Sequence, residues 1–126
     1  MKKVIETTEA PAPIGPYNQA ILVDKTLYAS GQIALDPKTM ELVNEDIQAE
    51  TTQVMKNLSE VLKAAGMDFT NVVKATIYLA DMGDFDLVNE VYGGYFNNDD
   101  APARETVQVA QLPKNVRVEI SVIAIL

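Results

Sequence analysis

The sequence has no cysteine and no histidine among its 126 residues. The absence of cysteine excludes disulfides and thiolate chemistry. The absence of histidine removes the usual general base near neutral pH and the commonest metal ligand in proteins. Any catalysis must therefore use carboxylates, tyrosine, arginine, hydroxyl groups, backbone groups or water, and we expect no metal and no other cofactor.

Basic residues and long apolar runs are also scarce. Ten basic residues face 18 acidic ones, which gives a formal net charge of −8. Such a chain repels phosphate backbones, and Lys2-Lys3 is the only basic pair, so we expect no nucleic acid partner. No apolar run is long enough to cross a bilayer, and the N-terminus lacks the apolar core of a signal peptide. We therefore expect a soluble, cytoplasmic protein with no membrane partner.

The length and composition predict one domain over residues 1–126. The hydrophobic fraction of 48% is ample for one core. Proline and glycine gather in residues 8–16, a segment too short to link two domains.

The periodicity of apolar residues predicts two helices and six strands. Apolar side chains recur at helical spacing over residues 47–65, where Asn44 or Asp46 can cap the start. A second helix is predicted over residues 84–96, although Gly93 and Gly94 lower its helix propensity. The strands follow from alternation with period two. Their expected bounds are residues 2–7, 17–23, 26–33, 71–79, 104–109 and 116–125.

The element order β-β-β-α-β-α-β-β predicts an α+β fold. We expect a mixed sheet of about six strands with two helices on one face. The other face then stays uncovered by the chain. It is either solvated, the default for such a sheet, or packed against copies of the chain with polar residues lining clefts between subunits.

The alternation assigns side chains to the two faces. The helix side is expected to receive Val73, Ala75, Ile77 and Leu79, together with Val118, Ile120, Val122 and Ala124. The uncovered face is expected to carry Tyr28, Ser30, Gln32, Lys74, Thr76, Tyr78, Arg104, Thr106, Glu119, Ser121, Ile123 and Ile125.

Arg104 is the central candidate for a functional residue. Pro102 fixes its own φ and biases Ala101 toward an extended backbone, so Arg104 opens a strand directly after a rigid turn. A guanidinium held in this way can donate two parallel hydrogen bonds to a carboxylate. The alternative is a surface arginine in a salt bridge, which is the commoner case for an isolated arginine.

Short motifs along the chain point to a known family. They are Gly15-Pro16-Tyr17-Asn18-Gln19-Ala20, Ala29-Ser30-Gly31-Gln32-Ile33, Asn89-Glu90-Val91-Tyr92, Pro102-Ala103-Arg104 followed by Val107-Gln108-Val109 and Leu112-Pro113, and Val118-Glu119-Ile120. In this order, and over nearly the whole chain, they resemble the RidA/YjgF family of small imine deaminases. Each motif is weak alone, whereas the ordered set is specific.

The resemblance implies a chorismate-mutase-like fold and a homotrimer with three clefts between subunits. It implies hydrolysis of enamine and imine intermediates, such as 2-iminobutanoate and 2-iminopropanoate, to 2-oxo acids and ammonia. Pyridoxal-phosphate dehydratases would supply these intermediates without forming a stable complex. The family's carboxylate-binding arginine falls on Arg104. The other cleft positions fall on Tyr17, Ser30, Gly31, Asn89, Val107 and Glu119.

The chain departs from the family pattern near this cleft. Asn18 replaces the usual Ser, and Glu105 replaces the usual Ser or Thr after the arginine. Alternation places Glu105 on the opposite face from Arg104, so we expect the cleft to survive. Val107 stands where some members have Cys.

The expected chemistry needs neither histidine nor metal. Arg104 would bind the carboxylate of a 2-imino acid, whose iminium carbon is already electrophilic. Glu119 or a backbone carbonyl would orient water, and Tyr17 would hydrogen-bond the leaving nitrogen. The structural alternatives are a salt bridge from Glu119 to Arg117 or Lys74, a partly buried phenol for Tyr17 and a strand hydroxyl for Ser30.

Three functional hypotheses follow from the sequence. The first is an imine and enamine deaminase. The second is a non-catalytic regulatory protein that binds small carboxylates in the same cleft, because family resemblance alone does not establish catalysis. The third is an RNA-directed nuclease, against which the net charge of −8 and the absence of histidine argue.

Overall fold

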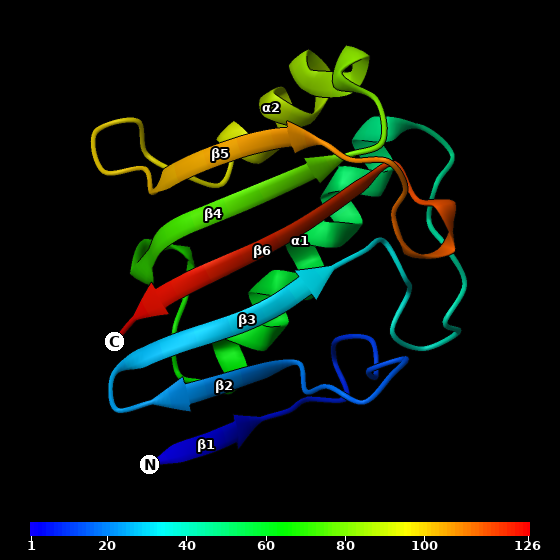
Figure 1. Cartoon of the computed structure of the whole chain (residues 1–126). Coiled ribbons are helices and arrows are strands. Elements are labelled where there is room, and N and C mark those ends of the chain that lie inside the picture. Colours follow the sequence, from blue (N-terminus) through cyan, green and yellow to red (C-terminus); the bar gives the residue numbers. More distant parts are fainter.

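A computed structural model describes residues 1–126 as a six-stranded sheet and two helices. The predicted element order is confirmed (Figure 1). No helix is both long enough and apolar enough to cross a membrane. The strands are β1 (Lys2–Ile5), β2 (Ala20–Val23), β3 (Thr26–Gln32), β4 (Val72–Leu79), β5 (Ala103–Gln108) and β6 (Val118–Ile125), and the helices are α1 (Ile47–Ala64) and α2 (Phe85–Gly93).

The sheet has the strand order β1-β2-β3-β6-β4-β5. All neighbouring strands are antiparallel except β4 and β5, which are parallel and joined by the crossover through α2. Both helices lie on one face of the sheet (Figure 1). The C-terminal strand β6 therefore lies inside the sheet between β3 and β4, whereas β5 is an edge strand.

The core fills the space between the helices and the covered face of the sheet. Side chains of α1, α2 and all strands except β5 form one continuous apolar cluster. On β6, Val118, Ile120, Val122 and Ala124 are buried as predicted. Glu119 is therefore on the uncovered face, also as predicted.

A bulge in β3 reverses the direction of Gln32. Ala29 pairs with Val122 and Gln32 with Ile120, so three steps on β3 match two steps on β6. An extra residue in one strand moves every following side chain to the other face. Gln32 is accordingly buried, and its predicted place on the uncovered face is wrong.

A second register shift, at the start of β4, exchanges Val72 and Val73. Val72 pairs with Ala124 and Lys74 with Ile123, so two steps match one. Val72 is buried and Val73 is 45% exposed. The predicted inward position of Val73 is therefore wrong, and the alternation holds only from Lys74 onward.

The side chains of β5 point to the opposite faces from those predicted, which has the largest functional consequence. Arg104 pairs with Ala75, and Thr106 pairs with Ile77. Ala75 and Ile77 are fully buried beneath the helices, so Arg104 and Thr106 point to the helix side. Their predicted place on the uncovered face is wrong, because alternation separates two faces without saying which one the helices cover.

The largest changes to the predicted element bounds are at the start of β2 and the end of α2. Tyr17 precedes β2 in an irregular segment, since β2 begins only at Ala20. Helix α2 ends at Gly93 with Gly94 as its C-cap, as the low helix propensity of the glycine pair favours. Beyond it, Tyr95 and Phe96 still pack against the core through Phe69, with ring centroids 5.3 and 5.4 Å apart.

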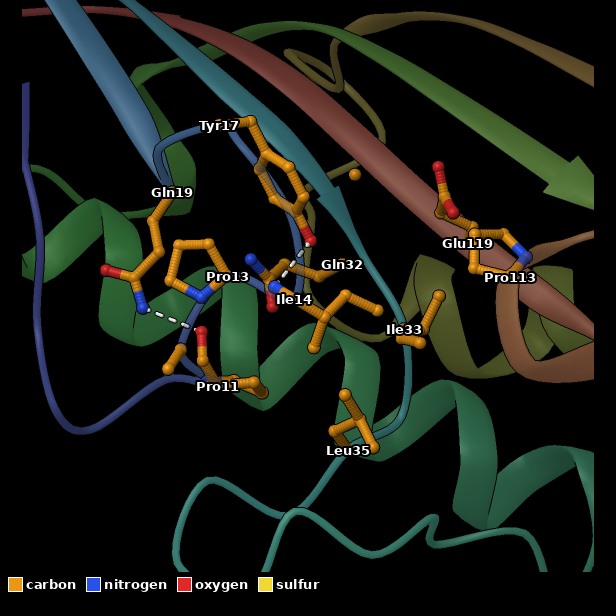
Figure 2. Close-up of a pocket in the computed structure, with 12 residues that line it drawn as sticks. Pro11, Pro13, Ile14, Tyr17, Gln19, Gln32, Ile33, Leu35, Pro113 and Glu119 are labelled. Carbon is orange, nitrogen blue, oxygen red and sulfur yellow. Dashed lines mark hydrogen bonds between the residues drawn. The ribbon is translucent and has the colours of Figure 1, made fainter.

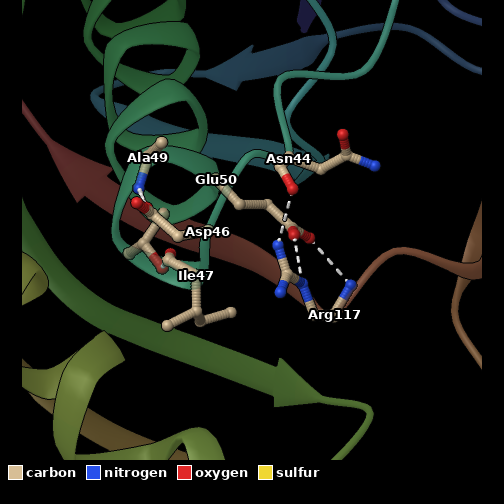
Figure 3. Close-up of polar contacts among 7 residues, drawn as sticks. Asn44, Asp46, Ile47, Ala49, Glu50 and Arg117 are labelled. Atoms are coloured by element: carbon tan, nitrogen blue, oxygen red, sulfur yellow. Dashed lines mark hydrogen bonds and ion pairs between the residues drawn. The ribbon is translucent and has the colours of Figure 1, made fainter.

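An ion pair between the buried carboxylate of Glu50 and the partly exposed Arg117 joins α1 to the start of β6 (Figure 3). Glu50 is 1% exposed, and its two carboxylate oxygens accept hydrogen bonds from Nε of Arg117 at 2.7 Å and from the backbone N–H of Arg117 at 2.8 Å. Arg117 also donates to the carbonyl of Asn44 at 3.0 Å. The helix cap is Asp46, whose carboxylate accepts from the N–H of Ala49 at 2.7 Å.

Replacing Arg117 tests this ion pair. Arg117→Ala leaves the Glu50 carboxylate buried without its charged partner, which should lower the free energy of unfolding by about 3 kcal/mol. Urea unfolding measures the change. The control is Lys63→Ala, which removes an exposed pair with Glu60 and should change stability by less than about 0.5 kcal/mol. Similar small losses in both variants would contradict a structural role for the pair.

Candidate functional site

The bulge in β3 makes room for the side chain of Glu119. Gly31 lies in the bulge, and a methyl group added there would lie 2.8 Å from Cδ and 2.9 Å from Cγ of Glu119. Real Cβ atoms do not approach other atoms so closely, so any other residue at position 31 would displace the carboxylate. The glycine is required by this close approach.

Glu119 is a half-buried carboxylate that the chain leaves unpaired. The Glu119 carboxylate makes no hydrogen bond or ion pair within the chain. The basic residues expected as its partners are paired elsewhere, Arg117 with Glu50 and Lys74 with Glu105 at 3.1 Å. The alternative of a structural salt bridge from Glu119 to Arg117 or Lys74 is therefore wrong. Burial raises the pKa of the Glu119 carboxyl above its usual value.

Tyr17 lines the same pocket as Glu119 and Gly31 (Figure 2). The phenol is half exposed, and its oxygen accepts a weak hydrogen bond from the N–H of Ile14 at 3.3 Å. The pocket combines these polar groups with an apolar wall. That wall consists of Pro11, Pro13, Ile14, Ile33, Leu35 and Pro113.

The segment that carries Tyr17 is tied down by Gln19 and Ser30. The buried Gln19 amide donates to the carbonyls of Thr7 at 3.0 Å and Pro11 at 2.8 Å and accepts from the N–H of Thr7 at 2.8 Å. The Ser30 hydroxyl donates to the carbonyl of Asn18 at 2.6 Å. The proton of Ser30 is thus used within the chain, which leaves its oxygen to accept.

Arg104 lies against α2, away from this pocket. Its Nη1 donates to Oδ1 of Asn89 at 2.6 Å. Its guanidinium carbon lies 5.1 Å from the ring centroid of Tyr92 and 5.6 Å from that of Phe85. Arg104, Asn89 and Tyr92 line a second hollow beside Pro102. The two aromatic contacts of Arg104 were not predicted from the sequence.

Val107 and Glu105 lie on the uncovered side of β5. Val107 pairs with Tyr78, which pairs with Glu119 on its other side, so the three form one row across the open face. Glu105 accepts from Lys74 and, at 2.9 Å, from Thr76. The Lys74 contact holds the pKa of Glu105 below its usual value. The predicted separation of Glu105 from Arg104 is confirmed.

The expected site residues thus form two groups within one chain. Tyr17, Gly31 and Glu119 line one pocket, with Ser30 beside them. Asn89 and Arg104 line the other. The groups lie on opposite faces of the sheet, and β4 separates the strands that carry Glu119 and Arg104. Neighbouring strands are about 4.8 Å apart, so the two backbones are roughly 10 Å apart.

Comparison with known proteins gives matches over nearly the full chain. The model of the family described as "Endoribonuclease L-PSP" matches residues 7–126. The chain is 54% identical to the 2-iminobutanoate/2-iminopropanoate deaminase of Homo sapiens over 125 residues, covering 99% of this chain and 90% of that protein.

Solved structures agree with this match. The Rid-family protein YyfA of Yersinia pestis superposes with a TM-score of 0.96 at 48% identity, covering all of both chains. Escherichia coli TdcF, solved with bound serine, superposes with a TM-score of 0.92 at 39% identity, covering 98% of each chain.

A methyl group at position 31 tests the close approach to Glu119. Gly31→Ala should displace the Glu119 carboxylate in a crystal structure and lower the free energy of unfolding by about 1 kcal/mol or more, as overpacking does. The matched control is Gly93→Ala in α2, where the added methyl contacts nothing and should stabilise by about 0.5–1 kcal/mol. An undisturbed Glu119 in the first variant would contradict the requirement for glycine.

Proposed function

Since this chain belongs to the endoribonuclease L-PSP family, the RidA/YjgF family expected from its motifs, we propose that Arg104 and Glu119 bind and hydrolyse its imine substrate. The enzyme deaminates reactive imine and enamine intermediates, namely 2-iminobutanoate and 2-iminopropanoate. The observation that carries the assignment of roles is the unpaired, half-buried carboxylate of Glu119 beside Tyr17.

The reaction adds water across a carbon–nitrogen double bond. Water attacks the imine carbon and loses a proton, and the nitrogen gains one, which forms a carbinolamine. The carbinolamine hydroxyl then loses its proton as its C–N bond breaks, and the nitrogen takes up that proton and leaves as ammonia, so that a 2-oxo acid remains. Glu119 accepts the proton of the attacking water and returns it to the nitrogen. Burial raises the pKa of the Glu119 carboxyl above its usual value, which makes the carboxylate a stronger base.

The remaining residues bind the substrate. Arg104 donates two parallel hydrogen bonds to the substrate carboxylate, and Tyr17 hydrogen-bonds the leaving nitrogen. Ser30 and Gly31 form the wall beside Glu119, and Val107 extends that wall along the open face. Asn89 supports Arg104 through its 2.6 Å hydrogen bond.

The cleft forms between two copies of the chain. One small 2-imino acid cannot reach both Glu119 and Arg104 of the same chain, because the two side chains point to opposite faces of the sheet. The uncovered face also exposes Tyr28, Val107 and Ile125, and two of its charged residues, Lys74 and Glu105, pair with each other. These features support a homotrimer in which this face packs against neighbouring copies.

Reactive imines hydrolyse and react with other molecules, so the enzyme must act where they arise. We therefore place it in the cytoplasm beside the pyridoxal-phosphate dehydratases that release such imines, with no stable complex between them. A regulatory protein that binds small carboxylates is an alternative that uses the same cleft. It would bind 2-oxo acids through Arg104 and would be indifferent to Glu119→Gln.

Substitutions of Arg104 test its role in binding the carboxylate. Arg104→Ala should lower kcat/KM by roughly thirty-fold to several thousand-fold, the equivalent of about 2–5 kcal/mol for an unpaired charge. Arg104→Lys should recover only a small part, because an ammonium lacks the planar fork. Steady-state ammonia release measures both. The control substrate has its carboxylate amidated, and its kcat/KM should be the same in the wild type and the variants. Near-wild-type kcat/KM of Arg104→Ala on the free acid would contradict the assignment.

Mixed assemblies test whether each site takes residues from two chains. Sedimentation equilibrium should give about three times the chain mass of 13.8 kDa. Glu119→Gln and Arg104→Ala should each be nearly inactive, yet equal amounts refolded together should regain about a quarter of wild-type activity by random assortment into a closed ring. Each variant refolded alone is the control. A monomer, or a mixture without regained activity, would contradict the shared cleft.

A further inference from the structure

We propose that helix α2 prearranges the guanidinium of Arg104, with Asn89, Phe85 and Tyr92 as positioning residues for the substrate carboxylate. The inference rests on the proposed function, in which Arg104 binds that carboxylate. These three residues are spaced four and three apart on α2, which places them on one face of the helix. Arg104 reaches that face from β5.

Asn89 fixes one edge of the guanidinium. Its Oδ1 accepts from Nη1 at 2.6 Å, a short and well-formed hydrogen bond. Arg has five N–H donors in a rigid fork, so this contact leaves the edge formed by Nε and Nη2 for a bidentate carboxylate. The amide is neutral and therefore leaves the positive charge uncompensated.

The two rings hold the guanidinium without neutralising it. Its central carbon lies 5.1 Å from the Tyr92 centroid and 5.6 Å from the Phe85 centroid, within the range of cation–π attraction. A flexible arginine loses side-chain entropy when it is fixed by a ligand, and a side chain held in advance loses less.

All contacts to Arg104 are neutral in a strongly acidic chain. Eighteen acidic residues are present, yet the three ion pairs of the chain join Lys63, Lys74 and Arg117 to carboxylates and leave Arg104 without one. An arginine needed only for folding gains from a carboxylate partner. An arginine that must bind an external anion needs neutral supports, as found here.

Tyr92 supports Arg104 through its aromatic ring and not through its hydroxyl group. That hydroxyl is buried and has no hydrogen-bond partner, so the ring is the part that supports Arg104. Tyr92→Phe keeps the ring, whereas Tyr92→Leu keeps only apolar volume. This pair of variants isolates the aromatic contact.

The experiment measures binding of 2-oxobutanoate, a non-reacting product, by calorimetry, together with KM for the imine. Asn89→Leu should weaken both about ten-fold, as loss of a hydrogen bond to a charged group does. Tyr92→Leu and Phe85→Leu should each weaken binding roughly two- to thirty-fold, and Tyr92→Phe should restore most of the affinity. Leu87→Ala, an exposed site on the same helix, is the unchanged control.

Asn89→Asp supplies a readout that a purely structural role would not change. The new carboxylate would pair with Arg104 and compete with the substrate carboxylate, so binding should fall further than in Asn89→Leu. It should recover in part as the pH falls and the aspartate protonates. In the Arg104→Ala background, neither Asn89 substitution should weaken binding further.

Two results would overturn the inference: unchanged affinity in Tyr92→Leu, or an Asn89→Asp variant no weaker than Asn89→Leu. Binding stoichiometry counts the folded sites, so a loss of folded protein is not read as a loss of affinity. If Arg104→Ala weakens binding and the α2 variants do not, the inference alone fails. If Arg104→Ala itself binds normally, the proposed function fails as well.

Discussion

The buried contact between Glu50 and Arg117 is the constraint on which the arrangement of this chain depends. It fixes the start of β6 against α1, and β6 is the strand that both β3 and β4 pair with. A carboxylate that is 1% exposed is tolerated only with a partner, so the position of Arg117 follows from that of Glu50. Two residues later, Glu119 lies on the uncovered face of β6. The contact that fixes Arg117 therefore also fixes the part of the chain that carries Glu119.

The same sheet places Glu119 and Arg104 on opposite faces, with β4 between the strands that carry them. Glu119 lies on an inner strand and faces the open side, whereas Arg104 lies on the edge strand and faces α2. Glu119 and Arg104 are thus kept from pairing with each other within one chain. Such a pair would neutralise both charges. In the proposed site, separation on opposite faces keeps each group available for a substrate held between two chains.

Much of the fold and part of the site could be predicted from the sequence. The strong apolar stripe of α1 and the alternation in β6 gave those elements correctly, because both are long and buried on one side. Gln32 and Val73 were misplaced because a bulge adds one residue without leaving a mark in composition. Arg104 was assigned to the wrong face because β5 has no buried apolar side that distinguishes the two. The grouping of Tyr17, Gly31 and Glu119 came from family motifs. The contacts of Arg104 with α2 depend on helix packing, which short-range sequence patterns do not reveal.

The close approach of Gly31 to Glu119 also constrains how this sequence can change over evolutionary time. A side chain at position 31 would force the side chain of Glu119 out of its present position. Replacing Glu119 by a small residue such as alanine would open the space, yet it would remove the unpaired carboxylate in the same step. If Glu119 has its proposed role, substitutions at the two positions, 88 residues apart in the chain, are therefore expected to depend on each other. One close contact between Gly31 and the side chain of Glu119 thus links the evolution of two distant positions.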